Sequence, residues 1–407
     1  MASSARSRST APHHASSPTD ALPRAVASAL SRYREPITSA LHEAINRSHT
    51  LTPADDDTRA LLESFYGQIA YHFGWRDARL AARKAQLGKL LRPTLVLLGY
   101  EIGASARTGA AVDLSEVSAV AGSAALAVEM IHNFSLIHDD IEDGDDLRHH
   151  RATLWRVWGQ PQAINTGDGL FALARLTLFD LLKTGVPADL VVRLAALLDV
   201  TCLRLCEGQF LDMSFEGRED VTVPMYLEMI ERKTAALMEC SLEMGALLGG
   251  ADEHLRAQLG AFGRALGMGF QLRDDLLGIW ASDRTLGKVA AGDLRRKKMT
   301  LPVIYALEHA QPDEREALAR VLAAEGPPTD EQIGLSLAIV ERTGARARAL
   351  HELRAQCEAA RAILLAISCP TLATASARDA LSALIDFIAA DTIVDGHPRV
   401  AGAQDRP

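Results

Sequence analysis

Five acidic side chains stand together within residues 130–153, directly behind an apolar run. They are Asp139, Asp140, Glu142, Asp143 and Asp145. If the run is helical, Asp139 and Asp143 share one face about one turn apart, and Gly144 is placed to end the helix. Two carboxylates at this spacing can hold a hard divalent cation. A solvated helix end with an acidic cluster explains this segment equally well when it is taken alone.

A second acidic pair, Asp274 and Asp275, lies inside another apolar helical pattern at residues 269–278. Two such pairs on two helices predict two carboxylate walls that face one cavity. Carboxylates cannot bind a diphosphate directly, whereas Mg²⁺ keeps several waters while it bridges carboxylate and phosphate oxygens. The two pairs together therefore predict a site for a diphosphate that is carried on Mg²⁺.

A diphosphate site also needs cationic side chains, and the sequence has them beside both acidic pairs. Lys89 and Arg92 stand three residues apart in GKLLRP, and Arg148 follows the first acidic cluster. Lys233 and Lys288 flank the second acidic pair. Each of these residues, taken alone, is more often a surface charge than a ligand for phosphate. Their spacing makes them candidates only.

The elements that must position these residues are predicted to be helices. Helical patterns follow one another from about residue 52 to about residue 393, without a convincing alternating strand and without internal repeats. Asp113 with Glu116, and Thr329 with Gln332, resemble capping boxes. The simplest architecture is a single large all-α bundle whose function lies between facing helices.

The domain boundaries follow from composition. Residues 1–50 are predicted to be a largely disordered or loosely helical N-terminal extension, because the first 22 are mainly Ser, Ala, Arg, Pro and His. A helical segment is expected from Leu22 to about Asn46. The folded domain is predicted to span residues 51–395, with a flexible tail at residues 396–407.

Composition excludes several classes of function. A net charge of −9 and a pI of about 5.8, without a basic stripe, argue against a nucleic-acid partner. Apolar runs are too short to predict a transmembrane segment. The cysteines contain no CxxC pair and are expected to be core thiols in a reducing compartment, the cytoplasm. They are Cys202, Cys206, Cys240, Cys357 and Cys369.

Several motifs occur in the order seen in one known family. These are GKLLRP, IHNFSLIHDDIEDGDDLR, GQFLD, KTAAL, FQLRDD and TLGK followed by GDLRRKKMTLP. Over roughly residues 60–310 the chain resembles the trans-polyprenyl diphosphate synthases, the family of farnesyl and geranylgeranyl diphosphate synthases. The resemblance implies an isoprenoid synthase bundle around a central cavity, and a homodimer.

The resemblance also implies roles for single residues. Residues that match the two aspartate motifs are implied to bind Mg²⁺, as three ions brought partly by the substrate diphosphate; they are Asp139, Asp140, Asp143, Asp274 and Asp275. Isopentenyl diphosphate is implied to bind to Lys89, Arg92 and His132. The allylic substrate is implied to contact Arg148, Lys233, Thr234, Gln271 and Lys288. The residues implied to act in catalysis are Asp139, Asp140, Asp143, Asp274 and Lys233.

Two positions depart from the family pattern. The second of two arginines after the first motif is replaced by His149, which makes that substrate contact weaker and pH-dependent; Arg151 is the candidate to compensate. The second motif has Gly278 in place of its third carboxylate. Water can fill that gap on Mg²⁺, so altered metal binding is expected rather than lost activity. His138, Gln209, Asp212 and the cysteines are interpreted as structural or cavity-closing groups.

The sequence therefore predicts a Mg²⁺-dependent prenyltransferase that condenses isopentenyl diphosphate with an allylic diphosphate. Phe134, five residues before Asp139, is bulky where long-chain members have a small residue, and DDIED lacks the two-residue insertion of short bacterial farnesyl synthases. This pattern favours geranylgeranyl diphosphate as the product. The alternatives are a farnesyl diphosphate synthase, a class I terpene cyclase and an inactive regulatory subunit. The N-terminal extension is a candidate docking segment for a partner protein.

Overall fold

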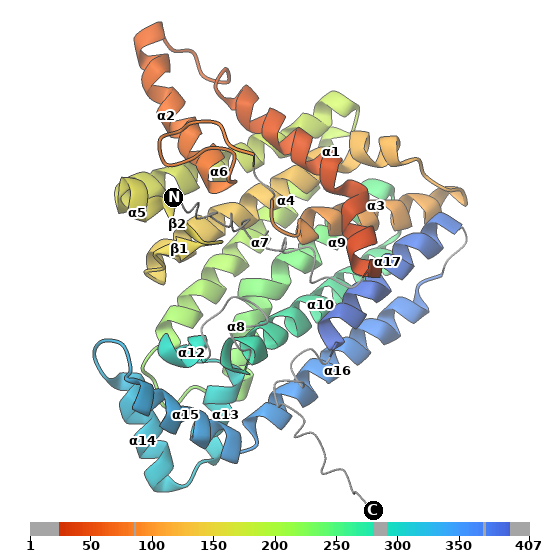
Figure 1. Ribbon diagram of the computed structural model, residues 1–407. Coiled ribbons are helices and arrows are strands. Elements are labelled where there is room, and N and C mark those ends of the chain that lie inside the picture. The colour runs from red at the N-terminus through yellow and green to blue at the C-terminus, as the bar shows by residue number, and fades with distance from the viewer. Residues whose placement is uncertain (1–23, 85–86, 281–290, 369–371, 391–407) are drawn as a thin grey trace, which may run out of the picture.

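Helices make up nearly all of the regular structure in the computed structural model, which describes residues 24–84, 87–280, 291–368 and 372–390 (Figure 1). The first half of the chain contains α1 (Arg24–Ser48), α2 (Asp56–His72), α3 (Leu91–Thr108), α4 (Leu114–Glu142), β1 (Leu147–Arg148), β2 (Arg151–Ala152), α5 (Leu154–Trp158), α6 (Gln160–Phe179) and the 3-10 helix η2 (Asp180–Thr184).

The second half continues the bundle. Its elements are α7 (Ala188–Phe215), α8 (Val223–Ile230), the π-helical turn η3 (Glu231–Ala235), α9 (Ala236–Gly249), α10 (Glu253–Trp280), α12 (Gly292–Arg295), α13 (Leu301–His309), α14 (Pro312–Ala323), α15 (Asp330–Arg342), α16 (Ala345–Ala366) and α17 (Leu372–Ala389). The predicted all-α fold class is confirmed.

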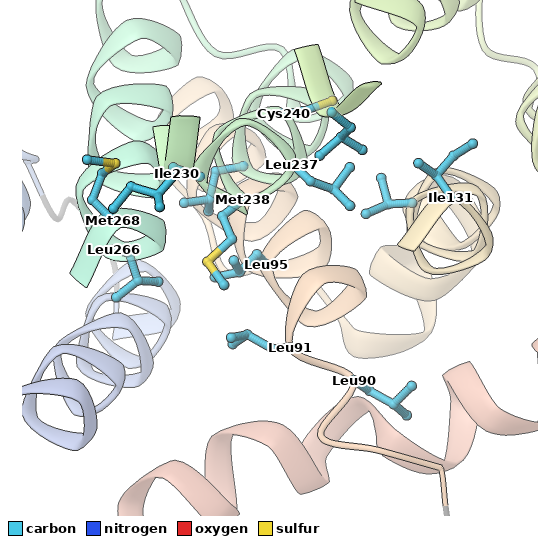
Figure 2. Close-up of a cluster of buried hydrophobic side chains, with 14 of the residues drawn as sticks. Leu90, Leu91, Leu95, Ile131, Ile230, Leu237, Met238, Cys240, Leu266 and Met268 are labelled. Atoms are coloured by element: carbon cyan, nitrogen blue, oxygen red, sulfur yellow. The ribbon is translucent and has the colours of Figure 1, made fainter. Parts of the chain in front are cut away.

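Helix α9 lies at the centre of the bundle and packs against α3, α4, α7 and α10. Its approach to α3 depends on glycine, because a Cβ on Gly245 would lie 2.0 Å from the carbonyl oxygen of Val96. Around this contact the side chains are apolar and buried, as Figure 2 shows for Leu95 of α3, Met238 of α9 and Leu266 of α10. This tight core fixes the helices whose ends carry the predicted site.

The N-terminal helix α1 belongs to this core. Its Tyr33, Leu41 and Ile45 are each at most 1% exposed, and it packs against α2, α3, α4 and α17 (Figure 1). An ion pair of 3.0 Å joins Arg32 to the buried Glu101 of α3. We therefore propose to place the start of the folded domain at α1 rather than at residue 51. The boundary at residue 396 lies outside the described residues.

Helix α4 is long and apolar enough to cross a membrane by length and composition, although the sequence was expected to hold no such run. Just over half of its apolar window, 56%, is buried inside the protein. It packs against α3, α6 and α9, and its last turn carries Asp139 and Asp140. We interpret α4 as a core helix of the bundle.

Two local expectations are corrected. Residues 147–152 form an antiparallel hairpin, in which His149 and His150 have φ of +50° and +61° and make the two-residue turn. Cys206 is exposed on α7, whereas Cys202, Cys240 and Cys357 are buried as predicted; Cys369 lies outside the described residues.

The predicted caps have different outcomes. Thr329 and Gln332 form the predicted capping box, with N–H···O distances of 2.8 and 3.3 Å between them. Asp113 caps α4 by accepting a hydrogen bond from the Ser115 N–H. Glu116 does not complete a box there, because it accepts a hydrogen bond from the hydroxyl of Tyr100 at 3.3 Å.

Candidate active site

An open cleft of about 330 Å³ lies among α4, α7, α8, η3, α10 and the segment 293–300. Seven carboxylates and four cationic side chains line it, so the cleft has an excess of negative charge and suits bound cations. The carboxylates are Asp139, Asp143, Asp145, Asp212, Asp274, Asp275 and Asp293. The cationic residues are Arg148, Lys233, Arg296 and Lys298. Both predicted acidic pairs therefore contribute to one cavity.

The first acidic cluster is positioned by the end of α4. Asp143 is the C-cap residue, and its N–H donates to the carbonyl oxygen of Asp139 at 2.8 Å. Gly144 follows with φ of +65°, as predicted for the residue that ends this helix. Asp139 and Asp143 face the cleft. Asp140 is 3% exposed and pairs instead with Arg148 of the hairpin, at 2.7 Å between Oδ1 and Nη2.

Burial and neighbouring charges set the electrostatics of this cluster. Burial raises the pKa of Asp139 to about 6, although the charge of Lys233 partly offsets it. Burial likewise raises the pKa of Asp140, against the opposing effect of Arg148. The carboxylate of Asp143 is paired with Lys298 Nζ at 3.0 Å. The cluster thus holds negative charge that is only partly compensated within the protein.

Lys233 enters the cleft from the π-helical turn η3. Its Nζ lies 2.6 Å from Oδ2 of Asp212 on α7. Burial lowers the pKa of Lys233, but Asp212 and Asp139 outweigh burial, so its pKa is raised and it stays charged. The two helices can approach because α7 has glycine here: a Cβ on Gly208 would lie 2.3 Å from the backbone nitrogen of Lys233. Such π turns are frequent at functional sites.

A chain of hydrogen bonds holds Asp275 in place. Thr234 Oγ1 donates to Gln271 Oε1 at 2.8 Å, and Gln271 Nε2 donates to Asp275 Oδ1 at 3.0 Å. The hydroxyl of Tyr226 donates to the other carboxylate oxygen. Burial is the largest cause that raises the pKa of Asp275 to about 7. Both oxygens of Asp275 are thus engaged within the protein, and Asp274 lines the cleft beside it.

The residues predicted for isopentenyl diphosphate lie beside the cleft. Arg92, in the first turn of α3, donates from Nη1 to Nε2 of His132 on α4 at 3.1 Å. Burial and the charge of Arg92 lower the pKa of His132 well below its usual value, so this imidazole is neutral. The Nζ of Lys89 lies 5.0 Å from the ring centre of Phe387 on α17. Burial lowers the pKa of Arg92, and the negative charges of Glu129 and Asp274 partly offset this effect. Arg92 and Asp274 therefore interact electrostatically.

Arg92 keeps a free donor. Its Nε is buried and has no hydrogen-bond partner among the described residues. A buried donor without a partner costs free energy unless a ligand or water satisfies it. An anionic ligand at this position would do so.

The hairpin holds one predicted contact at the cleft and another away from it. Arg148 lines the cleft. His149 is exposed as a residue and lies at the turn of the hairpin. Partial burial of its ring, and then the charge of Arg148, lower its pKa. Arg151, the candidate to compensate for His149, is turned toward the backbone at the end of α2 and just beyond it. Its Nη2 donates to the carbonyl oxygens of Tyr71 and Arg76 at 2.8 and 3.2 Å.

Other sequence candidates lie at the edges. The ring of Phe134 contacts Phe171 of α6, with 5.2 Å between ring centres, below the first acidic cluster and outside the cleft lining. His138 lies 3.4 Å from the carbonyl oxygen of Ile164, as a structural histidine would. Gln209 donates to Glu142 at 2.7 Å. Lys288 lies outside the described residues.

The donor set of the cleft fits a hard cation that keeps several waters. Among the described residues, no three His, Cys, Asp or Glu side chains converge closely enough to hold a metal without other ligands. The oxygens that face one another across the cleft are carboxylates from α4 and α10, the ligand type that Mg²⁺ prefers in small number. Asp139, Asp143 and Asp274 are the side chains that would hold it.

Sequence reasoning missed several cleft residues, all at or near the segment 293–300 or on α8. They are Tyr226, Asp293, Arg296, Lys298 and Thr300. Four of them belong to the motif GDLRRKKMTLP, whose order in the chain indicates the family but does not by itself place its side chains in the cleft. Its charged residues and its place directly after the second acidic pair were the available signal.

Comparisons with known proteins agree with this geometry. The sequence profile of the family described as polyprenyl synthetase matches residues 79–338. The (2E,6E)-farnesyl diphosphate synthase of Mycobacterium tuberculosis is 39% identical over 288 residues, which are 70% of this chain and 76% of that protein. The geranylgeranyl diphosphate synthase of the same organism is 39% identical over 286 residues, 70% of this chain and 77% of that protein.

A solved structure extends the likeness to the whole bundle. The polyprenyl synthetase from Streptomyces coelicolor A3(2) is 37% identical, with a TM-score of 0.75 that covers 90% of this chain and 100% of that chain. Two relatives named for different products match this sequence equally well. The likeness therefore does not resolve the length of the product.

Proposed function

Because the chain belongs to the polyprenyl synthetase family, we propose that it condenses isopentenyl diphosphate with an allylic diphosphate to give geranylgeranyl diphosphate. The chain is a trans-prenyltransferase of the short-chain class. What carries the proposal is the cleft, where two acidic pairs face each other and a second cationic group, Arg92 with Lys89, lies beside them. The two acidic pairs suit a diphosphate that is carried on Mg²⁺. Arg92 and Lys89 suit the diphosphate of the second substrate.

The cleft residues favour ionisation of the allylic substrate. Bound Mg²⁺ would supply Lewis-acid stabilisation of the departing diphosphate. Asp139, Asp143 and Asp274 would hold the cations on the two walls, while Lys233 and Arg148 direct positive charge at the diphosphate oxygens. The carbon–oxygen bond breaks with its electron pair on the diphosphate, which leaves an allylic carbocation.

The second substrate is held two turns earlier on the same helix. His132 lies seven residues before Asp139 on α4, about 10 Å along the axis, so one helix reaches both substrates. Arg92 and Lys89 bind the diphosphate of isopentenyl diphosphate, and the buried Nε of Arg92 gains the partner that it lacks. The double bond attacks the carbocation, a carbon–carbon bond forms, and a proton is lost to the released diphosphate.

Product length is proposed to depend on Phe134. Its ring stands against Phe171 below the first acidic cluster, and one turn deeper Met130 is 1% exposed and accepts a hydrogen bond from Thr177 at 3.7 Å. If the prenyl tail of the product extends from the cleft toward the contact between α4 and α6, it would meet the ring of Phe134 before Met130. This arrangement supports a product of twenty carbons, with fifteen as the second candidate because the farnesyl synthase is as similar as the geranylgeranyl synthase.

The test is a product analysis with the full chain. The protein is incubated with Mg²⁺, isopentenyl diphosphate and each allylic primer, and the products are identified by mass. A twenty-carbon diphosphate as the main product supports the proposal, and a fifteen-carbon product replaces it with the farnesyl alternative. A hydrocarbon or alcohol from the primer alone would identify a terpene cyclase, and no turnover would identify an inactive subunit.

A homodimer is proposed from the exposed side of α6 and α7. Large apolar side chains repeat along α7 at Val192, Val200, Leu203 and Phe210, each at least 58% exposed, next to exposed apolar residues of α6. A stripe of this size on a soluble chain marks an interface, and a second copy can cover it by two-fold symmetry. Sedimentation of the full chain and of Leu203→Lys tests this: the variant should shift toward monomer. Residues 1–23, ahead of α1, remain the candidate docking segment for a partner protein.

A further inference from the structure

The second acidic pair lacks a third carboxylate on its own helix, because the residue one turn beyond Asp274 is Gly278. A Cβ built on Gly278 would lie 1.9 Å from Oδ2 of Asp293 and 2.4 Å from its Cγ. The three heavy atoms nearest to that Cβ all belong to the Asp293 carboxylate. Asp293, which is carried by α12, therefore fills the space that a side chain at position 278 would take.

We propose that Asp293 supplies the third carboxylate of the second acidic pair, which is thus assembled from α10 and α12. An aspartate at position 278 would be on the same helical face as Asp274, four residues earlier. The carboxylate of Asp293 stands at that face without being part of the helix. The inference rests on the proposed function, because it assigns the group to the same cation and diphosphate site.

The surroundings of Asp293 agree with a role in the cleft. Its side chain lines the cleft with Asp274 and Asp275, although the residue is only 7% exposed. Asp293 and Asp275 line the same cleft, and the charge of Asp293 adds to the effect of burial in raising the pKa of Asp275. Buried carboxylates at close range repel one another unless cations lie between them.

A second observation points to a ligand here. Thr300, 5% exposed, lines the same cleft, and among the described residues its Oγ1 has no hydrogen-bond partner. The next residue, Leu301, donates its backbone N–H to Asp275, so this hydroxyl is beside the acidic group. A buried hydroxyl without a partner is normally satisfied by water or ligand. The water shell of a cation held by Asp293 would satisfy it.

A purely structural role is the alternative. Asp293 stands in the first turn of α12 and lies 3.3 Å from Arg296, so it could serve only to hold this short helix. That role would change stability when Asp293 is replaced. It would not change the binding of a cation with a diphosphate.

Binding of Mg²⁺ together with inorganic diphosphate to the full chain separates the two roles. Isothermal titration calorimetry is carried out on the wild type and on Asp293→Asn, which removes the charge and keeps the size. Affinity in Asp293→Asn is expected to fall about 10- to 100-fold, the range for groups that support a bound metal. The Mg²⁺ concentration for half-maximal elongation should rise in parallel.

A double variant moves the carboxylate back onto α10. Gly278→Asp with Asp293→Ala is expected to bind Mg²⁺ and diphosphate nearly as well as the wild type. Gly278→Asp alone should bind more weakly than the double variant, because the new Cβ meets the Asp293 carboxylate. The matched control is Asp330→Asn, which removes the exposed partner of Arg295, 2.9 Å away, and loosens α12 without changing the cleft. This control should bind like the wild type.

Each result decides the inference. Wild-type affinity in Asp293→Asn, or a double variant no better than Asp293→Ala alone, overturns it. If Asp293→Asn does not fold by circular dichroism, the double variant decides: restored binding supports the inference and lost binding overturns it. Elongation by the wild type is measured separately, so a failure of the proposed function is distinguished from a failure of this assignment.

Discussion

Glu129 offers a test of how α4 holds charge inside the bundle. It is 8% exposed, one turn before His132, and its Oε1 accepts a hydrogen bond from Asn133 Nδ2 at 2.9 Å. Burial raises its pKa from 4.5 to about 7, against the opposing effects of Asn133 and Arg92. Below pH 7, then, the folded protein holds this side chain neutral within electrostatic range of Arg92.

The sign of the pH effect follows from that pKa. Between pH 4.5 and about 7 the unfolded chain releases the proton of Glu129 while the folded chain keeps it. The stability that this group contributes is therefore complete below about pH 4.5 and is lost as the pH rises through 7. The difference between the two pKa values corresponds to on the order of 3 kcal/mol of unfolding free energy.

Glu129→Gln keeps the oxygen that accepts from Asn133 and never ionises. Relative to the wild type, this variant should gain about 2 to 3 kcal/mol of stability between pH 5 and pH 8, since most of the titration falls in that window. The neighbouring imidazoles do not interfere, because burial lowers the pKa of His72 to about 3 and that of His132 well below its usual value.

Denaturant unfolding of both proteins at pH 5 and pH 8 gives the four free energies required. Glu63→Gln, at an exposed glutamate of α2, is the matched control and should show no such change. If the difference between Glu129→Gln and the wild type is the same at both pH values, Glu129 keeps its ordinary pKa in the folded protein, and the expected effect of burial is refuted.

Three further outcomes are expected. Removal of residues 1–23 should leave folding unchanged. Leu41→Ala in α1 should lower the free energy of unfolding by about 2–5 kcal/mol in denaturant unfolding, because this side chain is fully buried. A change near zero would mean that α1 is not part of the folded domain. Phe134→Ala should lengthen the products seen by mass spectrometry by at least one isoprene unit, since each CH₂ gains roughly 0.8 kcal/mol on burial; unchanged products would place the floor at Met130. Lys89→Ala and Arg92→Ala should each raise the KM for isopentenyl diphosphate about tenfold to more than a hundredfold, because a charged contact contributes about 1.5–3 kcal/mol. The KM for the allylic substrate should stay unchanged. Equal shifts in both KM values would contradict the assignment.

Much of the site was predictable because its parts are contiguous. Asp139, Asp143 and Gly144 belong to one helix end, and helical periodicity alone placed both carboxylates on one face. The order of motifs then identified the family and, with it, the all-α fold. The helix at α1 was also expected from its pattern, but its burial against α3, α4 and α17 was not, since a periodic apolar face does not say what covers it.

Only the tertiary structure decided which distant groups meet. Asp293 stands over Gly278 from another helix, Asp140 of α4 pairs with Arg148 of the hairpin, and Arg151 donates to the backbone carbonyl oxygens of Tyr71 and Arg76. Local sequence determines helices, because backbone hydrogen bonds and side-chain periodicity act within a few residues. Contacts such as these depend on how the helices pack and on which charges lose their water, and neither quantity can be read from residues that lie close together in the chain.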